Sequence, residues 1–178
     1  MFFPIVACLC LLAGNHVAAQ SVKLVNRCES DIAPRVESSS AEFTVEQPVT
    51  LAHDEETTVH LPKGFFGRIC SDQDCKGSMA EFSFAREKVY YDISNILGYT
   101  IPHTISTSCG IASCLNSDCE CTEAFGPGDE GHHGGGCVIP AGREGPLRVC
   151  DDMGSVTVTY CASAPEVQPP LLTSHAEL

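Results

Sequence analysis

Apolar and polar residues alternate along many short segments of this chain, which are rich in β-branched and aromatic side chains and separated by turn residues. Such segments are typical of half-buried β-strands. No segment after the first twenty residues sustains an apolar period of 3.6 residues. The pattern therefore predicts an all-β sandwich. The expected strands are Ser21–Val25, Glu42–Val45, Val49–Leu51, Thr57–Leu61, Phe66–Ile69, Ala80–Phe84, Val89–Ser94 and Ser155–Tyr160.

The chain begins differently, with the apolar run MFFPIVACLCLLAG followed by the small residues Val17, Ala18 and Ala19. This arrangement predicts a secretory signal over residues 1–19. The run is shorter than the roughly twenty residues that a membrane-spanning helix needs, which disfavours a membrane anchor. Residues 20–161 then suit one domain. Residues 162–178, which contain proline and no cysteine, are expected to form a flexible tail.

Twelve cysteines are present, and Cys8 and Cys10 lie in the predicted signal, which leaves ten. An even number of cysteines in a secreted chain predicts disulfides, here five. The closest alternative is a zinc site formed by Cys119 and Cys121 with His132 and His133, but the glycine-rich segment around the histidines favours solvated side chains. No metal and no cofactor is expected.

The formal net charge is −13, and basic residues do not cluster. Nucleic acid is excluded as a partner because phosphate contacts need grouped lysine and arginine. An anionic membrane surface is disfavoured for the same reason. We expect a soluble monomer.

The candidate chemistry lies between Pro62 and Pro102, where Arg68, Glu81 and Asp92 fall on three neighbouring expected strands. Ala85 to Lys88 fit a hairpin connection between the second and the third of these strands. Pairing of the strands would place a carboxylate pair and a cation on one face. A purely structural ion-pair network would use the same residues.

The motifs in this stretch resemble those of thaumatin-like proteins, which carry G-R-[IF], then L-A-E-[FY], then F-Y-D-[VI]-S-x-[VI]-D-G-[FY]-N-x-P. The chain has GRI from Gly67, MAEF from Met79 and YYDISNILGYTIP from Tyr90. The opening VKLVNRC and the closing TVTYC are also similar to the family's first and last strands. The resemblance implies a thaumatin-like β-sandwich with a small disulfide-rich lobe, here residues 109–150.

The resemblance also implies disulfide pairs. It pairs Cys28 with Cys161 and Cys109 with Cys150. The family's distant partners for Cys70 and Cys75 are missing, so the simplest expectation is a local bridge between these two; a redox-active pair would favour two intervening residues. Four cysteines remain whose pairing the sequence leaves open: Cys114, Cys119, Cys121 and Cys137.

Thaumatin-like proteins carry an acidic cleft associated with β-1,3-glucan binding and, in some members, weak endoglucanase activity. By resemblance, Arg68, Glu81 and Asp92 match the first three of five cleft residues, Leu97 replaces the fourth, and Glu144 is the closest match to the fifth. Hydrolysis would need Glu81 as the protonated acid and Asp92, held ionised by Arg68, as its partner.

Aromatic residues near these charges could stack on sugars, and Tyr91 and Tyr99 are assigned to that role beside Tyr90, Phe65 and Phe66. Only one of Tyr90 and Tyr91 can face the cleft, because neighbouring strand residues point to opposite faces. The expected function is a secreted cell-wall protein that binds β-1,3-glucan with weak or no hydrolysis. The alternatives are an adhesin or interaction protein that binds a protein on another cell's surface, and an antifungal defence protein.

Overall fold

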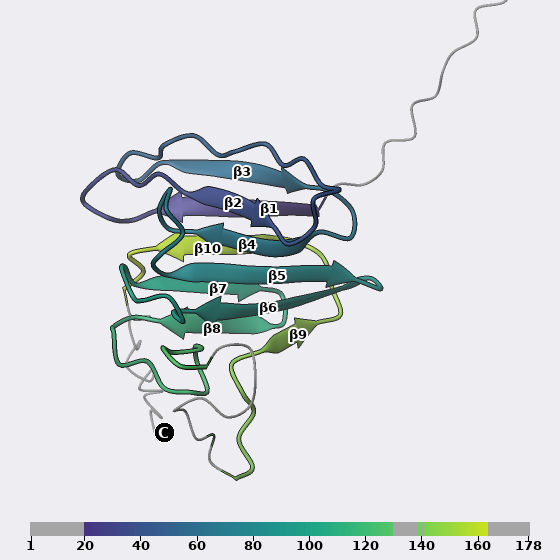
Figure 1. Ribbon diagram of the computed structural model, residues 1–178, viewed down its shortest axis with the longest axis vertical. Helices are drawn as coiled ribbons and strands as arrows, with labels where there is room; N and C mark the ends of the chain where they lie inside the picture. The colour runs from purple at the N-terminus through teal and green to yellow at the C-terminus, as the bar shows by residue number, and fades with distance from the viewer. Residues whose placement is uncertain (1–19, 130–138, 140, 164–178) are drawn as a thin grey trace, which may run out of the picture.

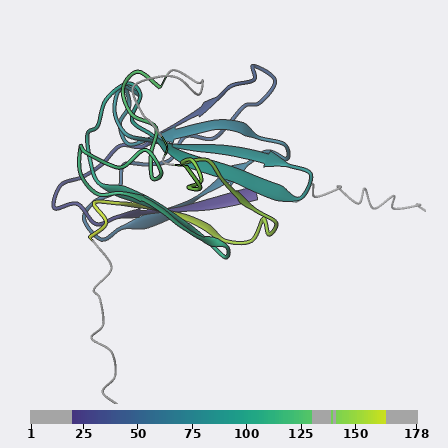
Figure 2. The same ribbon diagram turned by 90° about the horizontal axis from the view of Figure 1, so that it is seen from below.

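A computed structural model describes residues 20–129, 139 and 141–163 of the chain. Two five-stranded sheets pack face to face, and the described residues contain no α-helix (Figures 1 and 2). The all-β sandwich expected from the sequence is confirmed. The strands are β1 Gln20–Asn26, β2 Arg35–Ser38, β3 Glu56–Leu61, β4 Phe66–Cys70, β5 Met79–Ala85, β6 Lys88–Ser94, β7 His103–Thr107, β8 Gly110–Cys114, β9 Arg148–Cys150 and β10 Val156–Tyr160.

The first sheet has the strand order β3-β1-β10-β7-β8 and the second has the order β2-β4-β5-β6-β9. Antiparallel pairs form both sheets except at the centre of the first, where β1 and β10 run parallel. Because Asn26 lies opposite Tyr160 in this pair, Cys28 and Cys161 follow the two strand ends side by side and form a disulfide. The bond joins the beginning and the end of the domain.

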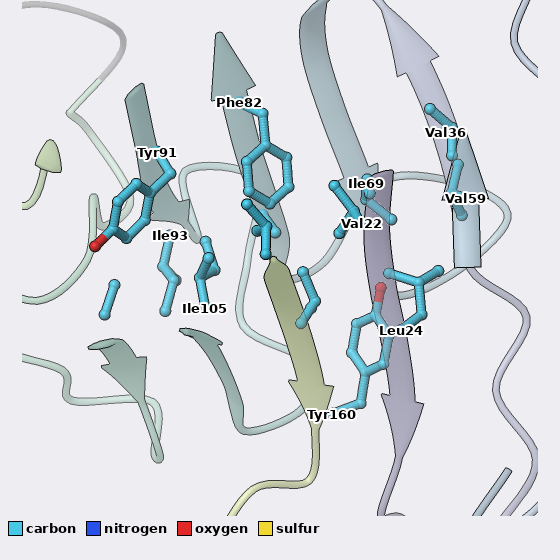
Figure 3. Close-up of a cluster of buried hydrophobic side chains, with 14 of the residues drawn as sticks. Val22, Leu24, Val36, Val59, Ile69, Phe82, Tyr91, Ile93, Ile105 and Tyr160 are labelled. Atoms are coloured by element: carbon cyan, nitrogen blue, oxygen red, sulfur yellow. The ribbon is translucent and has the colours of Figure 1, made fainter. Parts of the chain in front are cut away.

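The core lies between the two sheets, where each strand directs alternate side chains inward. Figure 3 shows Ile69, Phe82 and Tyr91 from the second sheet facing Val22 and Leu24 from the first. All five side chains are buried. The register of the core consequently fixes which residues of the second sheet point outward.

Two further contacts tie the sheets together. Cys109, in the turn between β7 and β8, forms a disulfide with Cys150 of β9. The buried imidazole of His103 on β7 approaches the carbonyl oxygen of Met79 on β5 at 3.3 Å.

Two more disulfides are local and join Cys70 to Cys75 and Cys114 to Cys119. Cys121 is disulfide-bonded as well, whereas Cys137 lies outside the described residues. The three pairs expected from the sequence, Cys28–Cys161, Cys70–Cys75 and Cys109–Cys150, are those that form. Stable disulfides of this number are typical of extracellular proteins, because cytosolic thiols stay reduced.

Some expectations concern residues that the structure does not describe. The predicted signal at residues 1–19, the histidines of the alternative zinc site and nearly all of the expected tail lie outside the described residues. No described helix has the length and apolarity to cross a membrane.

Several expected elements differ from the observed ones. Glu42–Val45 and Val49–Leu51 are not strands, and only Leu51 makes an isolated bridge, to Ile32. The side chain of Gln47 forms hydrogen bonds with both the amide and the carbonyl group of Val36 on β2. This segment therefore contacts the edge of the sheet through a side chain and not through backbone pairing. The disulfide-rich lobe at 109–150 begins with β8 and ends with β9, neither of which was among the expected strands.

Candidate functional site

The second sheet aligns four ionisable side chains in one cross-strand row, which we call the charged row. Glu37 on β2 lies opposite Arg68 on β4, Arg68 lies opposite Glu81 on β5, and Glu81 lies opposite Asp92 on β6. Directly opposite residues share a face of the sheet, and their Cβ atoms are about 5 Å apart. The expectation that strand pairing brings Arg68, Glu81 and Asp92 to one face therefore holds.

A tight hairpin positions the two carboxyl groups. The loop between β5 and β6 contains only Arg86 and Glu87, and both have positive φ, 53° and 62°. Two such residues form a type I′ turn, whose twist matches that of the strands it joins. The four-residue connection expected from the sequence is two residues shorter, because Ala85 and Lys88 pair with each other; the register of the hairpin sets Glu81 directly opposite Asp92.

Arg68 binds Glu37, a residue that the sequence did not single out. Its Nε and Nη2 donate hydrogen bonds of 2.9 and 2.7 Å to Oε2 of Glu37. Arg35 pairs with the other oxygen of the same carboxylate at 3.1 Å. Glu37 is 31 positions from Arg68 in the chain, and no motif surrounds it, so only the register of the sheet could have found it.

Asp92 is almost completely buried, with 8% of its surface exposed. Burial, with a smaller contribution from the Glu81 carboxylate, raises the pKa of Asp92 from 3.8 to about 8. No hydrogen-bond partner for its Oδ1 exists among the described residues. Asp92 is therefore protonated at neutral pH.

Glu81 is half-buried, and burial raises its pKa above the ordinary 4.5, while Arg68 and a hydrogen bond from Ser94 act in the opposite direction. Burial thus raises the pKa of both carboxyl groups. Asp92 is not held ionised by Arg68, because the hydrogen bonds of that guanidinium go to Glu37 and burial dominates at Asp92. Glu81, the expected acid, is the more exposed carboxyl of the pair and the one beside the cation.

The lobe joins the edge of the second sheet beside the charged row. Backbone hydrogen bonds join Phe125 to Ile93 and Asn95 at the end of β6, with lengths of 2.9 and 2.8 Å. An ion pair of 3.0 Å between Arg148 on β9 and Glu123 holds the same segment in place. In the next outward row Cys70, Met79 and Ser94 are buried, whereas Arg35, which pairs with Cys70 at the edge, is exposed. Asp92 lies beside the buried part of this row.

On the other side of the charged row the face is open, and its outward side chains are Phe66, Ser83, Tyr90 and Val149, which we call the aromatic row. Phe66 is 58% exposed and Val149 51% exposed. Ser83 and Tyr90 are partly exposed. Charged and aromatic side chains thus lie next to each other on one surface.

Four expected ligand contacts lie in the core or away from the charged row. Tyr91 points into the core with 2% exposure, and its hydroxyl shares a hydrogen bond of 3.1 Å with Thr107, so it cannot stack on a ligand. Phe65 is likewise fully buried. Tyr99 packs against the core and is only partly exposed. Glu144 is exposed in the segment before β9, and no described contact joins it to the charged row.

Leu97 occupies an exposed turn that follows β6, in which the Gly98 amide donates to the Asn95 carbonyl at 3.0 Å. Gly98 has a φ of +134°, a conformation that a residue with a side chain rarely adopts. The turn therefore keeps the glycine of the thaumatin-like motif, while its aspartate is replaced by a leucine that is 54% exposed.

No family model matches the chain, and no curated protein matches its sequence. Among solved structures, the chain is similar to the protein elicitor MoHrip2 from Magnaporthe oryzae, with a TM-score of 0.53, 18% identity, and coverage of 81% of this chain and 100% of that one. It is also similar to the thaumatin-like xylanase inhibitor TLXI, with a TM-score of 0.52, 15% identity, and coverage of 79% and 99%. The chain has the thaumatin-like fold.

Identities this low establish the thaumatin-like fold and nothing finer. Its site must be argued from the charged row and the aromatic row themselves. The structure groups Arg68, Glu81 and Asp92 of the expected site residues and adds Glu37. It places Phe66 and Tyr90 on the open part of that face, whereas Tyr91 points into the core.

Proposed function

We propose that this thaumatin-like protein is an extracellular binding protein that holds a cell-wall β-1,3-glucan on the outer face of its second sheet and does not hydrolyse it. The observation that carries the proposal is the position of the aromatic row directly beside the charged row. Sugar-binding surfaces combine a flat apolar surface for the ring faces with polar groups for the hydroxyls. Phe66 and Tyr90 offer the first, and Arg68 and Glu81 offer the second.

Burial of Asp92 argues for binding over catalysis. A glycosidase needs two carboxyl groups that both reach the scissile bond, one protonated and one ionised. Asp92 is protonated, as a catalytic acid must be, but only 8% of its surface is exposed. Glu81 is reachable, but Asp92, the carboxyl group that pairs with it in the charged row, is hidden from a ligand. Leu97 supplies no replacement carboxylate.

The charges of the face favour a neutral glycan. Arg68 is compensated by its ion pair with Glu37, and Asp92 is protonated at neutral pH, so the charged row offers hydrogen bonds without an excess of positive charge. A formal net charge of −13 would repel a polyanionic wall polymer. β-1,3-glucan is neutral and rich in hydroxyl groups.

The test is retention of the disulfide-intact protein on insoluble β-1,3-glucan, with chitin and cellulose as comparison solids and released reducing sugar assayed in the same tubes. We expect retention on glucan without sugar release, and weaker retention of Glu81→Gln. Asp118→Asn, a change at an exposed carboxylate in the lobe, is the matched control. Sugar release, or equal retention of Glu81→Gln and wild type, would contradict the proposal.

A second candidate is binding of a protein partner, favoured by two observations. The similar structures are a protein elicitor and a xylanase inhibitor, and the second of these proteins is named for an enzyme that it inhibits. In this chain Leu147 and Val149, at the open edge strand β9, are 55% and 51% exposed. An adhesin, an elicitor or a defence protein that inhibits a foreign enzyme would use such an edge.

This candidate predicts inhibition of a secreted xylanase or β-1,3-glucanase at a fixed stoichiometry. Leu147→Asp should abolish the inhibition without changing glucan retention. Full enzyme activity in the presence of a molar excess of the protein would reject it for these enzymes.

A further inference from the structure

The aromatic row also has a direction, which runs across the strands. Phe66 on β4 pairs with Ser83 on β5, Ser83 pairs with Tyr90 on β6, and Tyr90 pairs with Val149 on β9. The two aromatic residues are thus separated by one strand. With neighbouring strands about 4.8 Å apart, their backbone positions are roughly 10 Å apart.

Within this row Ser83 lies between the two rings, and its side chain is smaller than either of them. A ligand that rests on both rings therefore crosses a small side chain within the row. The separation exceeds the width of one sugar ring, so a single sugar cannot stack on Phe66 and Tyr90 together.

From this geometry we infer that the protein binds a linear glycan chain across the strands of the second sheet, stacked on Phe66 and on Tyr90 through two different sugars of the same chain. The inference rests on the proposed function and adds the orientation, the two stacking positions and a minimum length of ligand. One edge of the bound chain faces the charged row, which is displaced by two residues along each strand, about 6.8 Å.

A path along the strands is blocked at one end. Beyond the charged row the outward residues Cys70 and Met79 are buried with Cys75 in a small second core. The disulfide between Cys70 and Cys75 closes the loop over this end, and the Ser78 hydroxyl donates to the Ile101 carbonyl at 3.2 Å. A chain parallel to the strands would collide with this cover, whereas a chain across them stays on the open rows.

The chemistry of the ligand follows from the same surface. Phe66 has no polar atom in its side chain, so an exposed fraction of 58% suits contact with the apolar face of a sugar ring. Glu81 lies diagonally beside the two rings, on the same strand as Ser83, and can accept hydrogen bonds from hydroxyl groups at the edge of the chain. A neutral polyhydroxylated chain satisfies both rows at once.

The experiment measures dissociation constants for a series of soluble β-1,3-gluco-oligosaccharides, from the disaccharide to the heptasaccharide, with wild type, Phe66→Ala and Tyr90→Ala. Short members cover one ring and should lose little affinity when the other ring is removed. Members long enough to span both rings should bind wild type more tightly and lose about tenfold in either variant, as truncated anchor residues at binding surfaces do. Phe66→Trp, which keeps an aromatic ring at this position, should retain the affinity for a long oligosaccharide that Phe66→Ala loses.

Ile111→Ala is the matched control, because Ile111 has the same exposure as Phe66, 58%, but lies on β8 of the other sheet. It should bind every oligosaccharide as wild type does. A loss that is independent of oligosaccharide length, or a loss confined to one of the two aromatic variants, would overturn the inference and leave glucan binding intact. Absence of glucan binding by wild type would instead overturn the proposed function and the inference together.

Discussion

Replacing Asp92 with asparagine should stabilise the protein at neutral pH. The aspartate is 8% exposed, its Oδ1 has no hydrogen-bond partner among the described residues, and burial raises its pKa from 3.8 to about 8. At a pH between these two pKa values, Asp92 keeps a proton in the folded state that it has released in the unfolded state. Folding therefore becomes less favourable as the pH rises through this window, and the effect is complete above pH 8.

The slope worked from this shift is about 1.4 kcal/mol of unfolding free energy per pH unit. From about pH 4 to about pH 7 this slope lowers the unfolding free energy by about 4 kcal/mol. Sharing of the proton with Glu81 brings the expected loss to between about 2 and 4 kcal/mol. Asparagine is neutral in both states and removes this dependence. Asp92→Asn should thus match wild type near the lower pH and exceed its stability by that amount at neutral pH.

Chemical denaturation of the disulfide-intact protein at several pH values between about 4 and 8 measures this difference directly. Asp118→Asn serves as the control, because Asp118 is exposed. Its stability should follow that of wild type at every pH. Parallel curves of unfolding free energy against pH for Asp92→Asn and wild type would show that the pKa of Asp92 is not raised in the folded protein. A variant less stable than wild type at neutral pH would show that the carboxyl group stabilises the fold. Either result would refute the reasoning.

Three further outcomes are expected. Arg68→Met should raise the pKa of Glu81 further, because Arg68 lowers it in wild type; NMR titration of the Glu81 carboxyl measures this shift. No upward shift would contradict an effect of Arg68 on Glu81. Removing the Cys28–Cys161 disulfide, whose cysteines are 133 positions apart, should cost about 4 to 5 kcal/mol in urea unfolding, whereas removing Cys114–Cys119, five positions apart, should cost clearly less; equal costs would contradict the loop-closure argument. Tyr91→Phe should lose about 1 kcal/mol of stability with its hydrogen bond to Thr107 and leave glucan retention unchanged; reduced retention would contradict its place in the core.

The sequence predicted the centre of the second sheet well, because its signal there is local. Alternation over Ala80–Phe84 and Val89–Ser94 gave β5 and β6 and so placed Glu81 and Asp92 on one face. It could not give the length of the turn, since Arg86 and Glu87 lack the glycine or asparagine that usually marks a type I′ turn.

The missed features depend on contacts between distant parts of the chain. Glu37 joins the site only through the pairing of β2 with β4, and the four residues of β2 carry too short a pattern to be recognised. The choice between Tyr90 and Tyr91 needed the packing of the second sheet, which buries Tyr91. The burial of Asp92 likewise arises from the sheet and the lobe packed at the end of β6, so its pKa could not be foreseen from its neighbours in sequence.

The most direct test of a glucan-binding outer face is NMR mapping of the disulfide-intact protein during titration with a β-1,3-gluco-oligosaccharide. The account predicts that the largest chemical-shift changes fall on Phe66, Glu81 and Tyr90 of the second sheet, while Ile111 on β8 and Thr58 on β3 of the first sheet stay unchanged. Changes that gather on the first sheet, or no changes at saturating oligosaccharide, would contradict it.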